Sequence, residues 1–484
     1  MTNDPTASER IAGFLTALRP GDIPADVRHR AKIHILDTLG AGIAGASSRE
    51  VDISRTALGA VYGTPAPGSG APLWGTPAEL PALGAAFVNG IACHAFELDD
   101  SGGCDHSGAV VLPAALAAAS LPMAGSRGGV TDGGTADGGP HVGGASLLHA
   151  VIGGYEVARR VQDALGGYDS VNNAGWHSTG VCGTFGAAVA SGMILGLDTE
   201  QMVSAIGLAG SFTGGTWSFI GDGAMSKRMH VGRAAEAGLN SALLARSGFT
   251  GPRDLFAAPW GSFLRLYGRH EDIDQSRLFE TLGEEWQIER ASIKPYATCR
   301  STHAAIDVIL DLREQPGVSA GSVRNITVHT SALIADMCGK ADVGSLVSAQ
   351  LSMQFALATA LRHGGVGLAE VAEQGRTDPR ILELMERIHL VVDPQQQGGS
   401  AEPRIEVQTE SGTIIVQAVR AKGASTNRLS DDDTISKFMD LATTRLPETA
   451  ALSVVENVME LESSHDIGPL LRLLTVNSEP ALLR

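Results

Sequence analysis

Apolar residues recur at helical spacing through the first 290 residues of the chain. Residues 24–45 are typical: apolar side chains at Val27, Ala31, Ile35 and Leu39 share one face, and Pro24 suits the first turn. Similar patterns predict helices over residues 6–18, 49–62, 81–96, 109–124, 145–165, 180–196, 199–210 and 228–247. A short strand is possible at residues 72–75, but no strand pattern separates the segments from residue 81 onward. They therefore predict a helical domain and not a parallel α/β sheet.

The pattern changes near residue 290. Alternation of apolar and polar residues predicts strands over 323–330, 388–392 and 404–409, with 412–419 closing a hairpin. Helices are predicted over 302–312 and 346–361, and helical spacing returns at 431–440 and 448–462. The sequence therefore predicts a mainly α protein: a large discontinuous all-helical domain, residues 1–289 and 423–484, with an inserted smaller α+β lid domain, residues 290–422.

A glycine-rich segment, residues 128–144, interrupts the helical pattern. A Gly-Gly pair recurs there every five residues, which is typical of a flexible surface insertion. It is not a dinucleotide-binding fingerprint, because no strand precedes it.

Composition narrows the possible partners. The formal charge of −17 argues against binding to nucleic acid or to an anionic membrane, and an anionic substrate would need a locally cationic pocket. The five cysteines form no CxxC pair, and the N-terminus carries no signal-peptide pattern. The longest apolar run, near Val110, is too short to span a bilayer. We therefore expect a cytoplasmic protein without a metal cluster or disulfide framework.

The most informative motif runs from His94 to Ser101 and continues from Asp105 to Pro113. It places Glu97, Asp99, Asp100, Asp105 and His106 between two apolar helices. Buried ionisable groups are costly unless they are paired or used, so the motif is a candidate catalytic corner. The simpler interpretation is a polar turn whose carboxylates cap a helix.

Three further clusters carry histidines or cations at helix starts, where anions bind well. They are Asn172–Thr184 with His177, Gly221–Arg233 with Lys227 and Arg228, and Ile293–His303 with Lys294, Cys299, Arg300 and His303. Each is also compatible with an ordinary solvated helix end. Residues 345–355 read as core helix, with Gln354 the best polar candidate. Together the carboxylates, histidines and cations of these motifs suit proton abstraction beside a carboxylate, with Lys and Arg holding the substrate carboxylates. The sequence has neither the HExxH motif of zinc proteases nor the GxSxG motif of serine hydrolases.

The four motifs, in this order, resemble those of the MmgE/PrpD family over roughly residues 8–445. The resemblance implies a homodimer that acts without metal or organic cofactor on a small di- or tricarboxylate. By motif it carries over the active-site positions Ser101, His106, His177, Lys227, Lys294 and Cys299, with Asp99 and Asp100 beside them. His106 is the expected acid/base, supported by His177, and the two lysines are expected to hold carboxylates.

The implied activity is that of a hydro-lyase, similar to 2-methylcitrate dehydratase. An epimerase of imino- or amino-dicarboxylates, similar to iminodisuccinate epimerase, is the alternative, and a cis-aconitate-type decarboxylase comes third. The decarboxylase pattern has Asp at Glu97, Thr at Ser101, His at Cys299 and Tyr near Phe355. We therefore expect His106, His177, Asp99, Asp100 and Lys227 to be catalytic. We expect substrate to be bound by Ser101, Lys294, Arg300, His303, Cys299 and Arg228.

Overall fold

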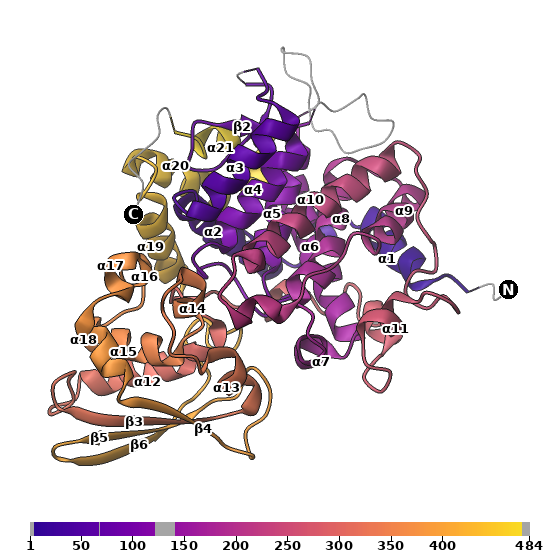
Figure 1. The fold of residues 1–484 in the computed structure, drawn as a ribbon. Coiled ribbons are helices and arrows are strands. Elements are labelled where there is room, and N and C mark those ends of the chain that lie inside the picture. The colour runs from indigo at the N-terminus through magenta and orange to yellow at the C-terminus, as the bar shows by residue number, and fades with distance from the viewer. Residues whose placement is uncertain (1–3, 67, 122–140, 477–484) are drawn as a thin grey trace.

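The computed structural model describes residues 4–66, 68–121 and 141–476. Most of the predicted glycine-rich insertion therefore lies outside the described residues, and only its last four positions, 141–144, are included. The fold is mainly α-helical with a smaller α+β part, as the sequence predicts. Figure 1 shows most of the helical part in the upper half and the four-stranded sheet, with its own helices, at the lower left.

Over the described residues, the helical part begins with ten helices. They are α1 (Ala7–Ala17), α2 (Ala25–Gly45), α3 (Arg49–Tyr62), α4 (Ala82–His94), α5 (Ser107–Ala119), α6 (Gly144–Ala164), α7 (Gly167–Asn173), α8 (Ser178–Ile194), α9 (Thr199–Ala209) and α10 (Ser226–Arg246). The sequence predicts nine of them, with bounds that differ from the observed ones by at most five residues, and misses α7. A two-stranded ribbon, β1 (Ala71–Pro72) and β2 (Glu79–Leu80), precedes α4, and the short α11 (Phe263–Tyr267) follows α10.

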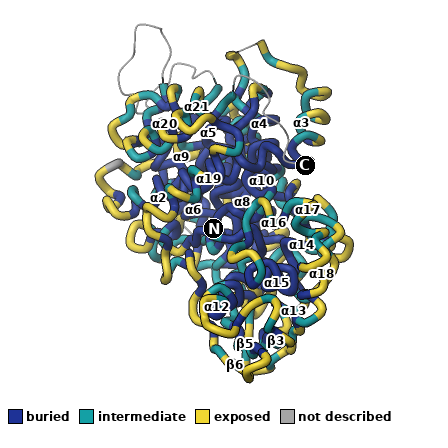
Figure 2. The backbone as a smooth tube through the Cα atoms, turned by 90° about the vertical axis from the view of Figure 1, so that its left-hand side faces the viewer, coloured by how far each residue is buried: buried dark blue, intermediate teal, exposed yellow. Residues whose placement is uncertain are grey.

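Small residues let these helices pack at very short distances. A Cβ added at Gly45 of α2 would lie 1.8 Å from the carbonyl oxygen of Ala92 in α4, and one at Gly238 of α10 would lie 2.3 Å from Cβ of Ala187 in α8. Helix α8 is buried along its length between α6, α10 and α5. Figure 2 shows this centre as the most deeply buried region of the chain. The chain has few aromatic residues to fill its core, and close packing of helix backbones fills it instead.

The α+β part contains seven helices and four strands. The helices are α12 (His303–Arg313), α13 (Ala332–Cys338), α14 (Leu346–Gln350), α15 (Met353–His363), α16 (Leu368–Val371), α17 (Glu373–Arg376) and α18 (Pro379–Met385). The sequence predicts one helix over 346–361, whereas the structure has two, α14 and α15. The break comes at Ser352, whose side chain caps α15 by accepting a hydrogen bond from the amide of Phe355.

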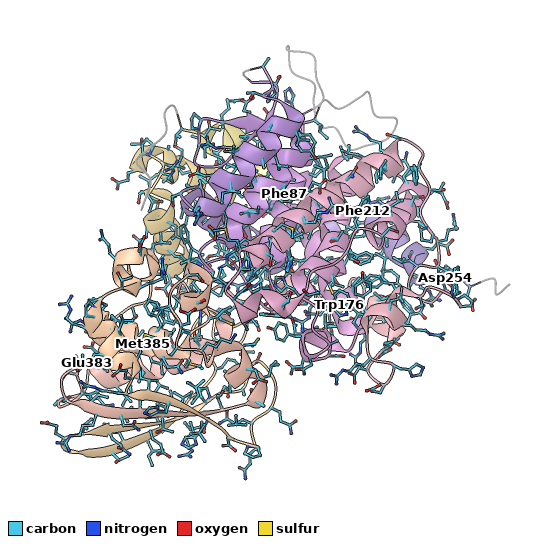
Figure 3. All side chains as sticks on the ribbon, viewed as in Figure 1. Phe87, Trp176, Phe212, Asp254, Glu383 and Met385 are labelled. Atoms are coloured by element: carbon cyan, nitrogen blue, oxygen red, sulfur yellow. The ribbon has the colours of Figure 1, made fainter. Side chains whose placement is uncertain are left out.

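The strands β3 (Val323–Thr330), β4 (Ile388–Val392), β5 (Arg404–Thr409) and β6 (Gly412–Gln417) form one sheet in the order β4-β3-β5-β6. Strand β4 is parallel to β3, while β5 and β6 are antiparallel to their neighbours. Helices α12, α15 and α18 cover one face of the sheet (Figure 1). In Figure 3, Glu383 and Met385 of α18 lie beside the sheet, far from Phe87 and Phe212 in the helical part.

The chain then returns to the helical part through α19 (Asp431–Ala442), α20 (Glu448–Met459) and α21 (Gly468–Leu473). Phe438 of α19 belongs to the same hydrophobic core as Ile35 of α2. Next to Phe438, the Lys437 ammonium also contacts α2 and lies 2.5 Å from a carboxylate oxygen of Asp37. These contacts support a discontinuous helical domain, and the boundaries at 289 and 422 stay a prediction. Within the described ranges, no helix combines the length and apolarity that a membrane crossing requires.

Candidate active site

The predicted catalytic corner is the turn between α4 and α5. Of the non-glycine residues in the described ranges, only Glu97 and Asp105 have positive φ, at 56° and 88°, and both lie in this turn. Such backbone costs about 1–3 kcal/mol per residue and persists where surrounding contacts impose it. The turn is tied to the segment before Lys294 by paired backbone hydrogen bonds of 2.9 and 2.7 Å between Ser101 and Ser292.

Glu97 is the anchor of the cationic groups. Its carboxylate accepts hydrogen bonds from the Lys227 ammonium, from Arg228 Nη1 at 2.7 Å and from Lys294 Nζ at 2.9 Å. Lys227 and Arg228 lie in the first turn of α10, where the helix dipole disfavours cations and a carboxylate compensates. Burial would raise the pKa of Glu97, but Lys227 and Lys294 outweigh it and hold the pKa well below its usual range. Glu97 is therefore an anion at neutral pH.

His106 lies between three acceptors immediately before α5. Its Nδ1 is 3.0 Å from a carboxylate oxygen of Asp99 and 3.0 Å from the backbone oxygen of Asp100. Its Nε2 is 3.3 Å from Asp105. Burial disfavours the charged ring, but Asp105 and Asp99 outweigh burial and raise the pKa of His106 to about 10. The ring is therefore an imidazolium at neutral pH and can act as a proton donor.

Two other histidines next to His106 are neutral. Burial lowers the pKa of His94 to about 3, although Asp99 lies 3.0 Å from its Nδ1. Burial and then Lys227 lower the pKa of His177 well below its usual value. The Nε2 of His177 lies 4.0 Å from Asp105, and its ring centroid is 6.2 Å from that of His106. The protonated His106 thus has two neutral imidazoles beside it.

A cavity of about 570 Å³ lies between the α+β part and the wall formed by Glu97, Asp105, His106 and Lys227 of the helical part. Five of the predicted site residues line it: Ser101, His106, Lys227, Cys299 and Arg300. The α+β side adds further polar groups, among them Ser301, Ser400, Glu402 and Arg420. The cavity is large enough for a molecule with several carboxylates, and both of its walls carry cations.

Arg300 is the cation of this cavity that is most available to a ligand. Within the described residues, its guanidinium forms no hydrogen bond or ion pair, whereas Lys227 is bound to Glu97. Burial lowers the pKa of Arg300 to about 10, so it still carries its charge at neutral pH. Arg420, on the same side, is shared with Glu402 at 3.2 Å. An unpaired, largely buried guanidinium suits bidentate recognition of a carboxylate.

Six predicted site residues do not line the cavity: Asp99, Asp100, His177, Arg228, Lys294 and His303. The first five lie directly behind the wall and contact its members, as the distances above show. His303 is separate: its Nε2 lies 3.2 Å from the backbone oxygen of Thr298, and its ring packs against Tyr296. Ten of the eleven predicted residues therefore lie in the cavity lining or directly behind it, and His303 lies at the N-terminal end of α12.

Some residues of the site were not among the eleven predicted site residues. His94 and Asp105 contact His106, and their place within the first motif was the available signal. Gln350, and not the expected Gln354, reaches the site by accepting a hydrogen bond from Arg228. Gln354 instead donates to the backbone oxygen of Gly339 at 3.0 Å. No local pattern distinguishes these two glutamines, because only the packing of α14 against the helical part selects one.

Among the described residues, two groups of side chains place metal-ligating atoms close together: His94 with Asp99 and His106, and Asp105 with His106 and His177. Both groups use His106. A metal ion at either position would have to replace a proton of the imidazolium. The contacts of the site are those of a protonated His106.

His106 of the turn faces Arg300 of the α+β part across one cavity, and comparison with known proteins places the chain within a family. Residues 9–276 match the MmgE/PrpD N-terminal domain, and residues 296–461 match the MmgE/PrpD C-terminal domain. The chain belongs to the MmgE/PrpD family, as the four motifs predicted.

The curated relatives are full-length matches at modest identity. The cis-aconitate decarboxylase-like protein oryM of Aspergillus oryzae is 29% identical over 98% of both chains. A cis-aconitate decarboxylase of Aspergillus terreus is 28% identical over 96% of this chain and 95% of its own. The human cis-aconitate decarboxylase is 26% identical over 98% of this chain and 95% of its own. These relatives support a lyase-type enzyme.

Proposed function

We propose that this protein is a cofactor-independent lyase that dehydrates a hydroxylated tricarboxylate such as 2-methylcitrate. The observation that carries the proposal is the pairing of a protonated His106 with a neutral His177, both in contact with Asp105. Elimination of water needs a base for the proton next to the carboxylate and an acid for the departing hydroxide. Two imidazoles in opposite protonation states supply both.

In the proposed reaction, Arg300 and Lys227 hold substrate carboxylates from opposite walls of the cavity. His177 accepts the α-proton, the carbon–carbon double bond forms, and the carbon–oxygen bond breaks as His106 donates the proton that completes the water molecule. Asp105 lies between the two Nε2 atoms and has to move aside for the substrate. After product release, the proton on His177 returns to His106 through Asp105.

Decarboxylation is a second candidate, which the names of the relatives favour. Loss of CO₂ leaves a carbanion that needs a proton donor and no base, and His106 would supply that proton. The position of His177 behind the cavity lining is compatible with this route. Against it, the chain carries Cys299 where the decarboxylase pattern has histidine. The homodimer and the cytoplasmic location also stay predictions.

One assay separates these reactions. The protein is incubated separately with 2-methylcitrate, citrate, cis-aconitate and aspartate in deuterated buffer, and ultraviolet absorbance, CO₂ release and deuterium incorporation are followed. An unsaturated product without CO₂ is expected. Release of CO₂ would establish decarboxylation instead, and deuterium incorporated into a dicarboxylate such as aspartate without elimination would indicate an epimerase. No reaction with any di- or tricarboxylate by the folded protein would refute the lyase proposal.

A further inference from the structure

A buried pair, Asp100 and Tyr155, lies directly behind the catalytic turn. The hydroxyl of Tyr155, from α6, donates to Asp100 Oδ2 at 2.6 Å. The other carboxylate oxygen accepts the backbone amide of Gly108, in the first turn of α5, at 3.0 Å. The backbone oxygen of the same Asp100 accepts the hydrogen bond from Nδ1 of His106. One residue therefore connects α6, the start of α5 and the imidazolium ring.

The packing around this pair leaves no room for adjustment. A Cβ added at Gly108 would lie 2.3 Å from Oγ1 of Thr38, 2.7 Å from the Tyr155 hydroxyl and 3.2 Å from Asp100 Oδ1. Asp100 and Tyr155 are 0% and 1% exposed, and neither lines the cavity. Asp100 and Tyr155 can therefore affect a bound substrate only by changing the position of the turn that carries His106.

We propose that Tyr155 is a positioning residue of the catalytic turn: by holding the Asp100 carboxylate, it keeps the start of α5 and the Asp100 carbonyl where His106 Nδ1 needs them. Nδ1 is then fixed as a donor toward Asp99 and Asp100, which leaves the Nε2 proton facing Asp105 and the cavity. For its kinetic consequence, this inference rests on the proposed lyase reaction. The contacts themselves do not depend on which reaction is catalysed.

The ionisable groups around Asp100 determine when it is charged. They are Asp99 beside it, Tyr155 of α6, His34 of α2 with Nδ1 at 3.8 Å, and Asp37 of α2. Burial raises the pKa of Asp100 to about 7, the hydrogen bond from Tyr155 opposes this, and Asp99 and Asp37 add to it. His34 is neutral, because burial lowers its pKa well below the usual value. Asp100 therefore changes charge near neutral pH.

A charged carboxylate holds the Gly108 amide and the Tyr155 hydroxyl more strongly than a neutral carboxyl does. We therefore expect kcat to rise as pH increases through about 7, when Asp100 loses its proton. Removing the Tyr155 hydroxyl removes a hydrogen bond that favours the charged Asp100 carboxylate, so the pKa of Asp100 rises. The rise of kcat with pH then moves to higher pH.

The test compares Tyr155→Phe with Tyr296→Phe, a matched loss of a 2.6 Å tyrosine–aspartate hydrogen bond that does not line the cavity. For Tyr155→Phe, the midpoint of the kcat–pH profile is expected to move up by roughly one unit, with KM within about twofold. At pH 6 kcat then falls about tenfold, and at pH 9 it approaches the wild-type value. Tyr296→Phe is expected to leave the profile unchanged.

An equal loss of kcat at every pH, or an unshifted profile, would show that Tyr155 has only a structural role. If Tyr155→Phe does not fold, Asp100→Asn replaces it and should abolish the limb near pH 7. Nuclear magnetic resonance of ¹³C-histidine-labelled protein, with the His106 signal assigned from His106→Gln, provides a readout without substrate. The signal should follow a titration near pH 7 that shifts upward in Tyr155→Phe. Absence of that shift overturns the inference, whereas lack of turnover with a normal titration refutes only the proposed reaction.

Discussion

At the residue scale, the candidate site is determined by how buried charges are paired. Glu97 brings together three cations, and Asp99 and Asp105 keep His106 protonated. Each ion pair offsets a desolvation cost that no single residue could sustain alone. Glu97 and Asp105 also carry left-handed backbone, so the strain of the turn is concentrated on the residues that form these pairs.

Replacing the proposed acid tests this arrangement directly. His106→Gln retains hydrogen-bonding capacity but cannot donate a proton from a charged ring. We expect kcat to fall by about 10²–10⁴-fold in steady-state assays on the active carboxylate. His149→Gln, a buried histidine of α6 outside the cavity, is the control and should retain wild-type kcat. More than about a tenth of wild-type kcat in His106→Gln would exclude His106 as the general acid.

At the element scale, the architecture depends on helices that touch backbone to backbone. Glycine and alanine in α2, α4, α8 and α10 allow these close crossings, which bring the starts of α5, α8 and α10 together around one wall. His106, His177 and Lys227 all lie at or beside such a helix start. The packing of the helices therefore determines where the proposed catalytic groups lie.

Two glycine substitutions separate packing from helix propensity. Gly45→Ala would place a Cβ 1.8 Å from a backbone oxygen of Ala92, so we expect a loss of about 1–3 kcal/mol or more in the free energy of unfolding. Gly59→Ala in α3 meets nothing within 4 Å and should stabilise the protein by about 0.5–1 kcal/mol. Urea denaturation measures both. Equal effects of the two changes would contradict the close-crossing argument.

At the scale of the whole molecule, the site is formed by two parts of the chain. The helical part supplies the acid/base wall, and the α+β part supplies Cys299 and Arg300 on the opposite side of the cavity. Helices α19 to α21 pack into the hydrophobic core of the helical part, so the α+β part is connected to the helical part at both of its ends. The substrate would thus contact both parts at once.

Arg300 tests whether the α+β part binds substrate. Arg300→Met removes the charge and keeps most of the volume, so we expect KM to rise about 10- to 100-fold with a smaller change in kcat, as for a lost charge-assisted hydrogen bond. Arg324→Ala, an exposed arginine of strand β3, is the control and should leave KM unchanged. Both variants are assayed against the same carboxylate. An unchanged KM in Arg300→Met would remove Arg300 from the proposed binding site.

Much of this molecule was predictable from local patterns. Helical spacing predicted α2 and α10 to within two residues, and alternation of apolar and polar residues predicted β3 at its observed bounds, because both signals depend on neighbours along the chain. The prediction of a single helix over 346–361 was wrong because Ser352 caps the start of a second helix. The apolar pattern continues across this position and gives no sign of the break. The motifs likewise identified ten residues that the fold groups together.

The sequence by itself determined which segments become helices and strands, which family the chain belongs to, and which residue types are available for chemistry. Tertiary structure alone decided their states. The folded turn places Asp99 and Asp105 against His106 and keeps it an imidazolium despite its burial, whereas burial makes His177 neutral. The fold also binds Lys294 to Glu97, 197 positions away, and leaves Arg300 facing the cavity. Desolvation and charge pairing depend on distances in space, and no pattern along the chain contains those distances.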